Sequence, residues 1–146
     1  MRTSKTRVLF VCIHNSARSQ MAEAYLNTLA GDRFEAESAG LEPGQIDPRV
    51  VSVMSEEGID LSKAQADDIM AFFQQRRLYD YVIYVCERAV EKDCPVFPGV
   101  RHTLRWPFEN PANISGDGPE ALDQIRAIRD RIRKQVEDWI AEMPAE

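Results

Sequence analysis

Cysteine and histidine are scarce in this chain, whose 146 residues include three cysteines and two histidines. An odd number of cysteines excludes a set of disulfides that pairs every thiol. No Cys-x-x-Cys pair is present, and a closed structural zinc site usually needs four well-spaced ligands, so we expect no metal site. In a reducing compartment, spaced thiols indicate reactivity more often than structural disulfides. The plainer alternative is three buried apolar cysteines.

Long hydrophobic runs and an excess of positive charge are also lacking. No stretch approaches the roughly 20 apolar residues that a membrane helix needs. The apolar run after the basic N-terminal residues covers only residues 8–13, which is too short for the core of a signal peptide. The formal net charge of -6 argues against general binding to nucleic acid or to an anionic membrane. We therefore expect a cytoplasmic protein, in which a small anion pocket can still be positive locally.

Nothing in the sequence divides the chain, so we expect a single domain over residues 1–146. β-branched and aromatic runs predict strands over residues 7–12, 34–40, 79–86 and 101–106. Helical spacing predicts helices over residues 16–30, 47–58 and 67–77, and a last helix that begins at Pro119. Asp47 is the expected cap of the second helix, with Pro48 in its first turn and Gly58 at its end. The last helix has an apolar face formed by Leu122, Ile125, Ile128, Ile132, Val136 and Ile140.

The predicted order is β-α-β-α-α-β-β-α, which favours an α/β fold with a four-stranded parallel sheet and helices on both faces. In such sheets, ligands bind beyond the carboxyl ends of the strands. Cys12 and Cys86 both lie at the carboxyl ends of predicted strands. The sequence therefore predicts two thiols at the same edge of the sheet.

The stretch "VCIHNSARSQ" places Cys12 at the end of the first strand and Arg18 at the start of the first helix. The backbone N–H groups of such a short loop can form a nest for an anion, and the helix N-terminus adds its positive end. Arg18 adds donors that match two oxygens of a tetrahedral anion. The same positive field lowers the pKa of a thiol, so we expect Cys12 to be a thiolate nucleophile. The alternative is a buried cysteine beside an ordinary helix start.

The residues between the thiol and the guanidinium are the candidate anion-binding residues. They are Ile13, His14, Asn15, Ser16 and Ala17. The hydroxyl groups of Ser16 and Ser19 can donate hydrogen bonds to the sulfur or to the loop, while His14 and Asn15 are expected to hold the loop in shape.

These motifs resemble a known family. "CIHNSARS" is similar to the Cys-x5-Arg-Ser/Thr loop of the low-molecular-weight protein tyrosine phosphatases. The longer "VCIHNSARSQMAEAYL", with "ESAG", "GIDLS" and "DYVIYVC...DCPVFPGV", resembles more closely the arsenate reductases of that fold, which couple to thioredoxin. The resemblance covers nearly the whole chain and implies a three-layer, flavodoxin-like sandwich. It also implies arsenate as the substrate, phosphate or sulfate as mimics, thioredoxin as the partner and no organic cofactor.

Three cysteines act in turn in the family that this chain resembles, and the resemblance assigns their roles to Cys12, Cys86 and Cys94. Cys12 would attack arsenate, and Cys86 would attack the adduct, releasing arsenite and leaving a disulfide. Cys94 would take over that disulfide and present it to thioredoxin. Residues 87–95 are polar and charged, which suits an exposed segment that carries a disulfide to a partner. The alternative is a solvated surface loop that happens to contain a cysteine.

The sequence departs from the family's pattern before Pro111. Phosphatases of this fold carry an Asp there as the general acid, whereas this chain has Asn110, and an amide cannot donate a proton as an acid does. General acid help is worth about 10²–10⁴-fold in rate, so phosphatase activity is weakened most. We expect Asn110 to hydrogen-bond the anion, and Glu109 or water to supply the proton. Within the loop, Ala17 replaces a cysteine found in many relatives, and His14 stands where small residues are common.

The same resemblance implies a site for a potassium ion, with the candidate ligands Asn15, Glu23, Ser38 and Asp67. Capping and loop hydrogen bonds are the alternative roles of these residues. For the whole chain we favour a thioredoxin-coupled arsenate reductase. A protein tyrosine phosphatase with Cys86 and Cys94 as a regulatory pair, and an oxyanion or redox sensor without turnover, remain as alternatives.

Overall fold

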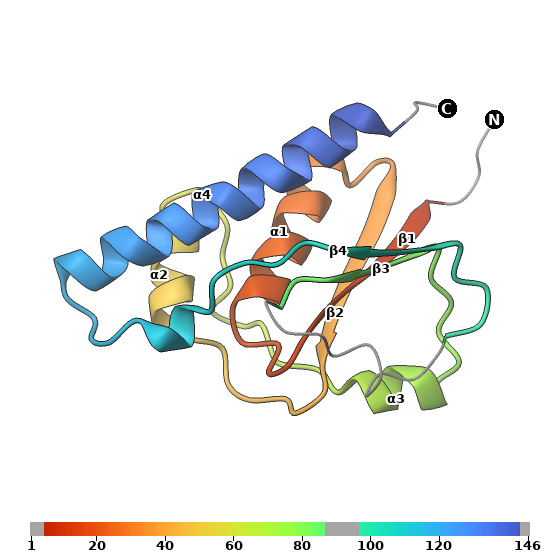
Figure 1. The fold of residues 1–146 in the computed structure, drawn as a ribbon, viewed down its shortest axis with the longest axis horizontal. Helices are drawn as coiled ribbons and strands as arrows, with labels where there is room; N and C mark the ends of the chain where they lie inside the picture. Colours follow the sequence, from red (N-terminus) through yellow and green to blue (C-terminus); the bar gives the residue numbers. More distant parts are fainter. Residues whose placement is uncertain (1–4, 87–96, 144–146) are drawn as a thin grey trace.

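The computed structural model describes residues 5–86 and 97–143, which form a four-stranded parallel sheet with helices on both faces (Figure 1). The strands follow the order β2-β1-β3-β4, with the bounds β1 (Thr6–Cys12), β2 (Phe34–Gly40), β3 (Tyr81–Tyr84) and β4 (His102–Arg105). The helices are α1 (Arg18–Ala30), α2 (Pro48–Ser55), α3 (Ile69–Gln74), the short 3-10 helix η2 (Pro111–Asn113) and α4 (Pro119–Glu142). The predicted fold class and the predicted order of elements are confirmed.

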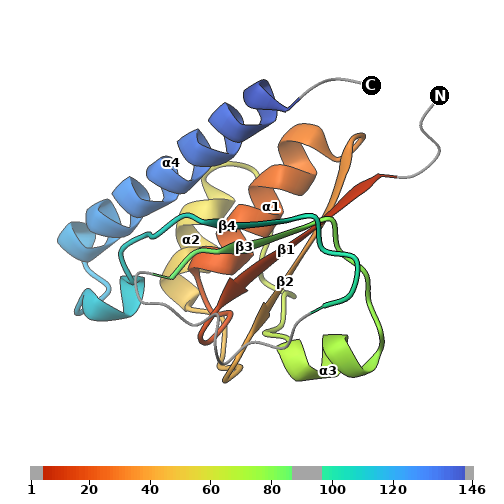
Figure 2. The same ribbon diagram turned by 45° about the vertical axis from the view of Figure 1, so that its right-hand side comes forward.

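Strand β1 lies between β2 and β3, and its alternate residues face two separate cores. Val8 and Phe10 pack in the core that α1, α2 and α4 cover, whereas Leu9 and Val11 pack in the core beneath α3. Figure 2 shows α1, α2 and α4 together on one side of the sheet and α3 on the other. A strand that is buried on both faces requires a continuous apolar run, which explains the sequence of this segment.

Helix α1 begins at Arg18 rather than at the predicted residue 16. Asn15 has a backbone φ of 53°, a left-handed conformation that interrupts a helix and that asparagine adopts more readily than most residues. The residues between β1 and α1 therefore form a loop. Strand β3 is also shorter than the predicted 79–86, because its ladder with β4 covers Tyr81–Tyr84 alone.

Helices α2 and α3 start at side-chain caps. The carboxylate of Asp47 accepts from the N–H of Arg49 at 2.9 Å, which confirms the predicted cap, and α2 ends at Ser55, before the turn that contains Gly58. The carboxylate of Asp68 likewise accepts from Met70, so α3 is shorter than the predicted 67–77. None of the helices within residues 5–86 and 97–143 has both the length and the apolar character needed to cross a membrane.

Helix α4 starts at Pro119, as predicted, and buries the centre of its apolar face. Ile125, Ile128, Ile132 and Val136 are fully buried, whereas Leu122 and Ile140, at the two ends of the face, are partly buried.

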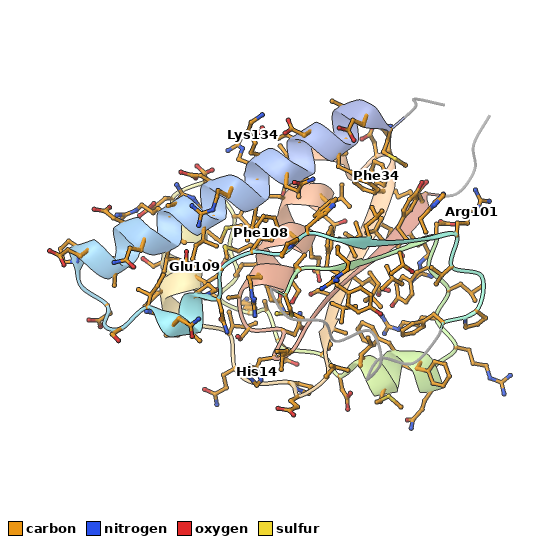
Figure 3. The ribbon with its side chains drawn as sticks, viewed as in Figure 1. His14, Phe34, Arg101, Phe108, Glu109 and Lys134 are labelled. Carbon is orange, nitrogen blue, oxygen red and sulfur yellow. The ribbon has the colours of Figure 1, made fainter. Side chains whose placement is uncertain are left out.

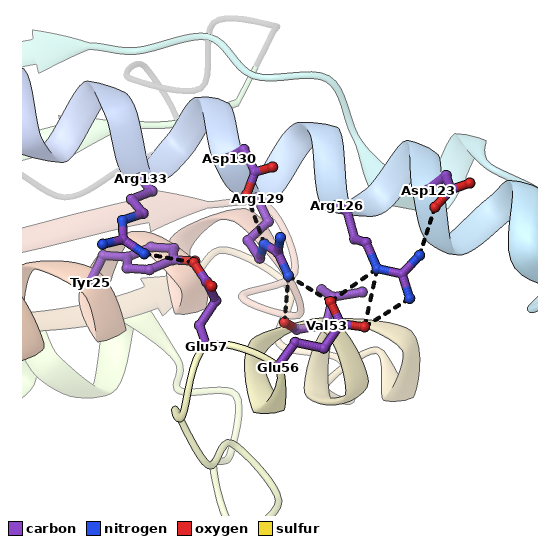
Figure 4. A network of polar contacts seen from close by, with 9 residues as sticks. All are labelled: Tyr25, Val53, Glu56, Glu57, Asp123, Arg126, Arg129, Asp130 and Arg133. Atoms are coloured by element: carbon purple, nitrogen blue, oxygen red, sulfur yellow. Dashed lines mark hydrogen bonds and ion pairs between the residues drawn. The ribbon is translucent and has the colours of Figure 1, made fainter.

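Polar contacts join α4 to α2 beside this core (Figure 4). Arg129 donates to the carbonyl of Val53 at 2.8 Å and to the carboxylate of Glu56 at 2.9 Å. Arg126 binds the same carboxylate at 2.8 Å. Because Arg129 is buried and its partners include a main-chain carbonyl, this network fixes the position of α2 against α4.

Candidate functional site

The loop between β1 and α1 turns its carbonyl groups outward. Segment 41–47 runs along the outside of the loop and donates backbone hydrogen bonds of 2.8–3.3 Å to the carbonyls of Cys12, Ile13, His14 and Ser16. On the inside, the N–H groups of Ile13 and His14 point at the Cys12 sulfur. Outward carbonyls and inward N–H groups form an anion-binding nest, and α1 begins directly after it.

The side chain of His14 strengthens the contact between the loop and segment 41–47. Its Nδ1–H donates to the carbonyl of Glu42 at 2.9 Å, and the ring is exposed (Figure 3). The structure therefore gives His14 a role in holding the loop, in agreement with the expectation from the sequence. The ring lies outside the nest, so its size does not obstruct the anion site.

Asn15 is fully buried and holds the middle of the loop. Its amide donates to the hydroxyl of Ser19 at 2.7 Å. The side-chain oxygen of Asn15, Oδ1, accepts from the side chain of Gln20 at 3.0 Å and from the N–H of Asp67 at 2.9 Å. These bonds offset the cost of the left-handed backbone at Asn15. Ala17, also buried, precedes the first residue of α1.

Gly40, at the end of β2, was not assigned a role from the sequence. A Cβ atom there would lie 2.7 Å from the carbonyl oxygen of Ile13 and 2.9 Å from the nitrogen of Asn15. Both neighbours are backbone atoms of the loop, so the position excludes any side chain. The glycine in "ESAG" was the signal that could have indicated this close approach. Gln20, which also bonds to the carbonyl of Gln65 at 3.0 Å, was likewise missed.

Two sulfur atoms lie at the floor of the nest. The thiol of Cys86, just beyond β3, donates to the sulfur of Cys12 with 3.0 Å between the two atoms, and both residues are buried. The structure thus brings together the two cysteines that were predicted at one edge of the sheet. Cys94, to which the third role was assigned, lies outside the described residues.

The two thiols have opposite protonation preferences. The pKa of Cys12 is lowered to about 6. The largest cause is the hydrogen bond from Cys86, and the Arg18 guanidinium and the loop N–H groups lower the pKa further, whereas burial acts to raise it. The pKa of Cys86 is raised well above its usual range by the same hydrogen bond and by burial. At neutral pH, Cys12 is therefore the thiolate and Cys86 the thiol.

Arg18 is buried and spans the gap between the nest and the segment that follows β4. Its Nη1 donates to the carbonyl of Phe108 at 3.1 Å, and its charge acts on the Cys12 thiolate. Among the described residues, the carbonyl of Phe108 accepts from Arg18, and a guanidinium has further N–H groups that can bind an anion.

The two residues predicted near the leaving group have other contacts in the structure. The side-chain oxygen of Asn110 accepts from the N–H of Ala112 at 3.0 Å, which caps η2. Glu109 is exposed and its carboxylate lies 3.4 Å from Arg131 of α4 (Figure 3). The structure therefore brings the Phe108 carbonyl to Arg18, and it does not bring the Glu109 carboxylate there.

The candidate cation ligands form an oxygen-rich cluster behind the loop. The hydroxyl of Ser38 donates to Glu23 at 2.6 Å. The pKa of Glu23 is raised to about 7, first by burial and then by the nearby carboxylates of Asp67 and Glu37, against the hydrogen bond from Ser38. Within residues 5–86 and 97–143, no group of three or more His, Cys, Asp or Glu is arranged to hold a metal ion.

Comparison with known proteins gives consistent matches. Residues 7–146 match the family model for low molecular weight phosphotyrosine protein phosphatase. An arsenate reductase of Halalkalibacterium halodurans is 34% identical over 136 residues, which cover 93% of this chain and 96% of that protein. A glutaredoxin arsenate reductase of Synechocystis sp. is 34% identical over 137 residues, which cover 94% of this chain and 98% of that protein.

Solved structures agree with these sequence matches. An arsenate reductase in the phosphate binding state has a TM-score of 0.76 and 32% identity, covering 95% of this chain and 99% of that chain. A thioredoxin-dependent arsenate reductase of Corynebacterium glutamicum has a TM-score of 0.62 and 30% identity, covering 94% of this chain and 64% of that chain.

Proposed function

We propose that this chain, which belongs to the low molecular weight phosphotyrosine protein phosphatase family, reduces arsenate to arsenite with its cysteine thiols. The observation that carries the proposal is the second thiol, Cys86, whose sulfur lies 3.0 Å from that of Cys12. A phosphatase needs one nucleophilic cysteine, whereas a reduction needs two electrons, which a pair of thiols supplies by forming a disulfide. Relatives and solved structures named as arsenate reductases support the same reading.

In the first step, the Cys12 thiolate attacks arsenic and one arsenate oxygen leaves as water, after it has taken up protons. The nest and Arg18 bind the remaining oxygens and stabilise their negative charge. The product of this step is a covalent adduct with a bond between sulfur and arsenic(V). Water supplies the protons, because the Glu109 carboxylate lies beside Arg131, and Asn110 contacts the anion.

In the second step, the sulfur of Cys86 attacks the sulfur of Cys12. A disulfide forms, the sulfur–arsenic bond breaks, and its electron pair stays on arsenic, which leaves as arsenite. The largest cause of the raised pKa of Cys86 is its hydrogen bond to the Cys12 thiolate. Since the adduct has no thiolate at Cys12, the first step itself makes Cys86 easier to deprotonate.

In the third step, Cys94 attacks Cys86, so that the disulfide passes to the Cys86–Cys94 pair and Cys12 becomes a free thiolate again. An external dithiol then reduces this disulfide. We propose thioredoxin for this role, on the likeness to the thioredoxin-dependent structure. The likeness to a relative named glutaredoxin arsenate reductase makes glutaredoxin the competing reductant.

We further propose that residues 1–146 form one domain that works in the cytoplasm without an organic cofactor, and that phosphate or sulfate mimics arsenate in the nest. Glu23, Ser38, Asp67 and Asn15 would hold a potassium ion, whose charge would balance the carboxylate of Glu23. A higher melting temperature in potassium chloride than in choline chloride tests this site.

The test of the proposed function is a coupled assay with arsenate, thioredoxin, thioredoxin reductase and NADPH. We expect arsenate-dependent loss of NADPH that vanishes in Cys12→Ser and in Cys94→Ser. Without a reductant, wild-type protein should release one arsenite per chain and lose two titratable thiols. A parallel reaction with glutaredoxin and glutathione decides between the two reductants.

Other outcomes of this assay would overturn the proposal. Robust hydrolysis of an aryl phosphate without arsenate-dependent oxidation of NADPH would identify a phosphatase. Binding of phosphate or sulfate with neither activity would identify a sensor without turnover.

A further inference from the structure

Arg49, in the first turn of α2, lies apart from the thiols but makes an unusual set of contacts. Its Nη1 donates to the carbonyls of Ile114 at 2.6 Å and Gly116 at 2.9 Å, and its Nη2 donates to the carbonyl of Pro111 at 3.0 Å. One guanidinium thus binds three main-chain carbonyls of the segment between β4 and α4. A planar fork of donors can do this, whereas a lysine ammonium cannot match the geometry.

Asp47 orients this guanidinium and connects it to the nest. Its carboxylate binds Nε of Arg49 at 3.1 Å and Nη2 at 2.7 Å. Its backbone N–H donates to the carbonyl of Ser16, within the nest, at 3.0 Å. The two residues therefore form a continuous link from the nest to the segment 111–116.

The burial of the pair indicates that the link is rigid. The side chains of Asp47 and Arg49 are 16% and 15% exposed, respectively. Burial alone would raise the pKa of Asp47, but hydrogen bonds from Arg49 outweigh it, and the pKa is lowered. The charged pair therefore persists at neutral pH, and hydrogen bonds that involve charged groups are about twice as strong as neutral ones.

The same segment has a second anchor at the guanidinium of the nest. Arg18 donates to the carbonyl of Phe108, so the segment 108–116 is held by Arg18 at one end and by Arg49 at the other. The N–H of Phe108 also donates to the carbonyl of Val85 at 3.4 Å, which is a long bond. Freeing the Arg49 end would remove three bonds from the segment, so the Phe108 carbonyl would be held less firmly against Arg18.

We propose that Asp47 and Arg49 are positioning residues, which set the distance between the nest and the segment 108–116 and so hold Arg18 in its anion-binding orientation. This inference rests on the proposed function for its effect on arsenate turnover. Neither residue touches the anion, and both act through the main chain of the segment.

The test compares Arg49→Met, Arg49→Lys and Asp47→Asn in the full chain with wild type. Asn keeps the helix cap but loses the charge, and Lys keeps the charge but loses the fork. We expect Arg49→Met to lower the kcat for arsenate by roughly 10- to 100-fold, because small misplacements of catalytic groups have effects of this size. Arg49→Lys should recover only part of the lost kcat. The kcat of Asp47→Asn should lie between those of Arg49→Met and Arg49→Lys.

The affinity for inorganic phosphate separates this inference from the proposed function. It is measured by calorimetry on the same proteins. We expect Arg49→Met to weaken phosphate binding about tenfold, which corresponds to about 1.4 kcal/mol. Arg126→Met, which removes an arginine of the α4–α2 contacts, is the control and should leave phosphate affinity unchanged.

The outcomes that would overturn the positioning role differ from those that would overturn the proposed function. Variants of Arg49 and Asp47 that melt at lower temperature but keep wild-type kcat, KM and phosphate affinity would overturn the positioning role. A wild type that binds phosphate without reducing arsenate would overturn the proposed function alone, and the phosphate affinities would still decide the role of the pair. A wild type that binds neither anion would overturn both.

Discussion

The sulfur atoms of Cys12 and Cys86 lie 3.0 Å apart although the two residues are separated by 74 positions in the sequence. Their strands, β1 and β3, are neighbours in the parallel sheet, and the ladder pairs Val11 with Tyr84. The two cysteines therefore follow paired strands at the same edge. The geometry makes one sulfur a hydrogen-bond donor and the other an acceptor, and this determines which of them is the nucleophile.

The first prediction concerns the titration of Cys12. Its pKa is lowered to about 6, so thiolate absorbance at 240 nm should rise with a midpoint near pH 6, and arsenate reduction should fall below that pH as the sulfur becomes protonated. Cys86→Ala removes the largest cause of the lowered pKa and should move the midpoint to higher pH. Cys12→Ser gives the baseline without this thiolate. An unchanged midpoint in Cys86→Ala would show that the hydrogen bond has no influence.

The second prediction concerns Gly40. Gly40→Ala places a Cβ within 2.7–2.9 Å of two backbone atoms of the nest, which cannot move without distorting it. We expect a loss of about 1–3 kcal/mol in the free energy of unfolding, as for other overpacked sites, together with loss of phosphate binding. Gly44→Ala is the matched control, because its Cβ would meet only a side-chain carbon of His14 at 3.7 Å. Equal phosphate affinity in the two variants would contradict the close-packing argument.

The third prediction concerns Arg129 of α4. Arg129→Met leaves the carbonyl of Val53 without this donor and should lower the free energy of unfolding by about 1–3 kcal/mol in urea denaturation. Lys134→Met is the control on the same helix. The Lys134 side chain is 74% exposed, against 10% for Arg129, and its ion pair with Asp138 is worth about 0.3–0.5 kcal/mol. Similar losses in both variants would mean that the contacts with α2 do not stabilise the fold.

The fourth prediction concerns Asn110. Asp is as good a cap as Asn, so Asn110→Asp should keep the cap of η2 while adding a group that can carry a proton. We expect hydrolysis of an aryl phosphate to accelerate, by at most about 10²–10⁴-fold, which is the range of general acid catalysis. Asn110→Ala should show no gain. An aspartate variant as slow as wild type would indicate that this position does not face the leaving group.

The pattern of strands and helices predicted where the two thiols would meet, since strand ends in a parallel sheet share one edge and Cys12 and Cys86 both lie at strand ends. The sequence did not predict where α1 begins. That point depends on the left-handed backbone of Asn15, which buried bonds from Gln20 and Asp67 support. Gln20 lies five residues from Asn15, but Asp67 lies 52 positions away and is brought to it only by the fold.

Contacts to main-chain atoms could not be predicted from the sequence either. Arg49 binds three carbonyls, and any residue type could supply them, so no pattern of side chains indicates the link. Gly40 is required by the approach of a loop from another part of the chain. Glu109 was predicted near the anion from its position beside Asn110, but its side chain turns to Arg131.

The central position of β1 also determines how the site behaves during native-state fluctuations. Val8, Leu9, Phe10 and Val11 are fully buried and are paired on both sides, whereas β4 is an edge strand with exposed residues. Amide protons of β1 should exchange with solvent only through global unfolding, and those of β4 through smaller local openings. We therefore expect the nucleophile to follow the slowest-exchanging strand of the sheet, and local opening at β4 to leave Cys12 in place.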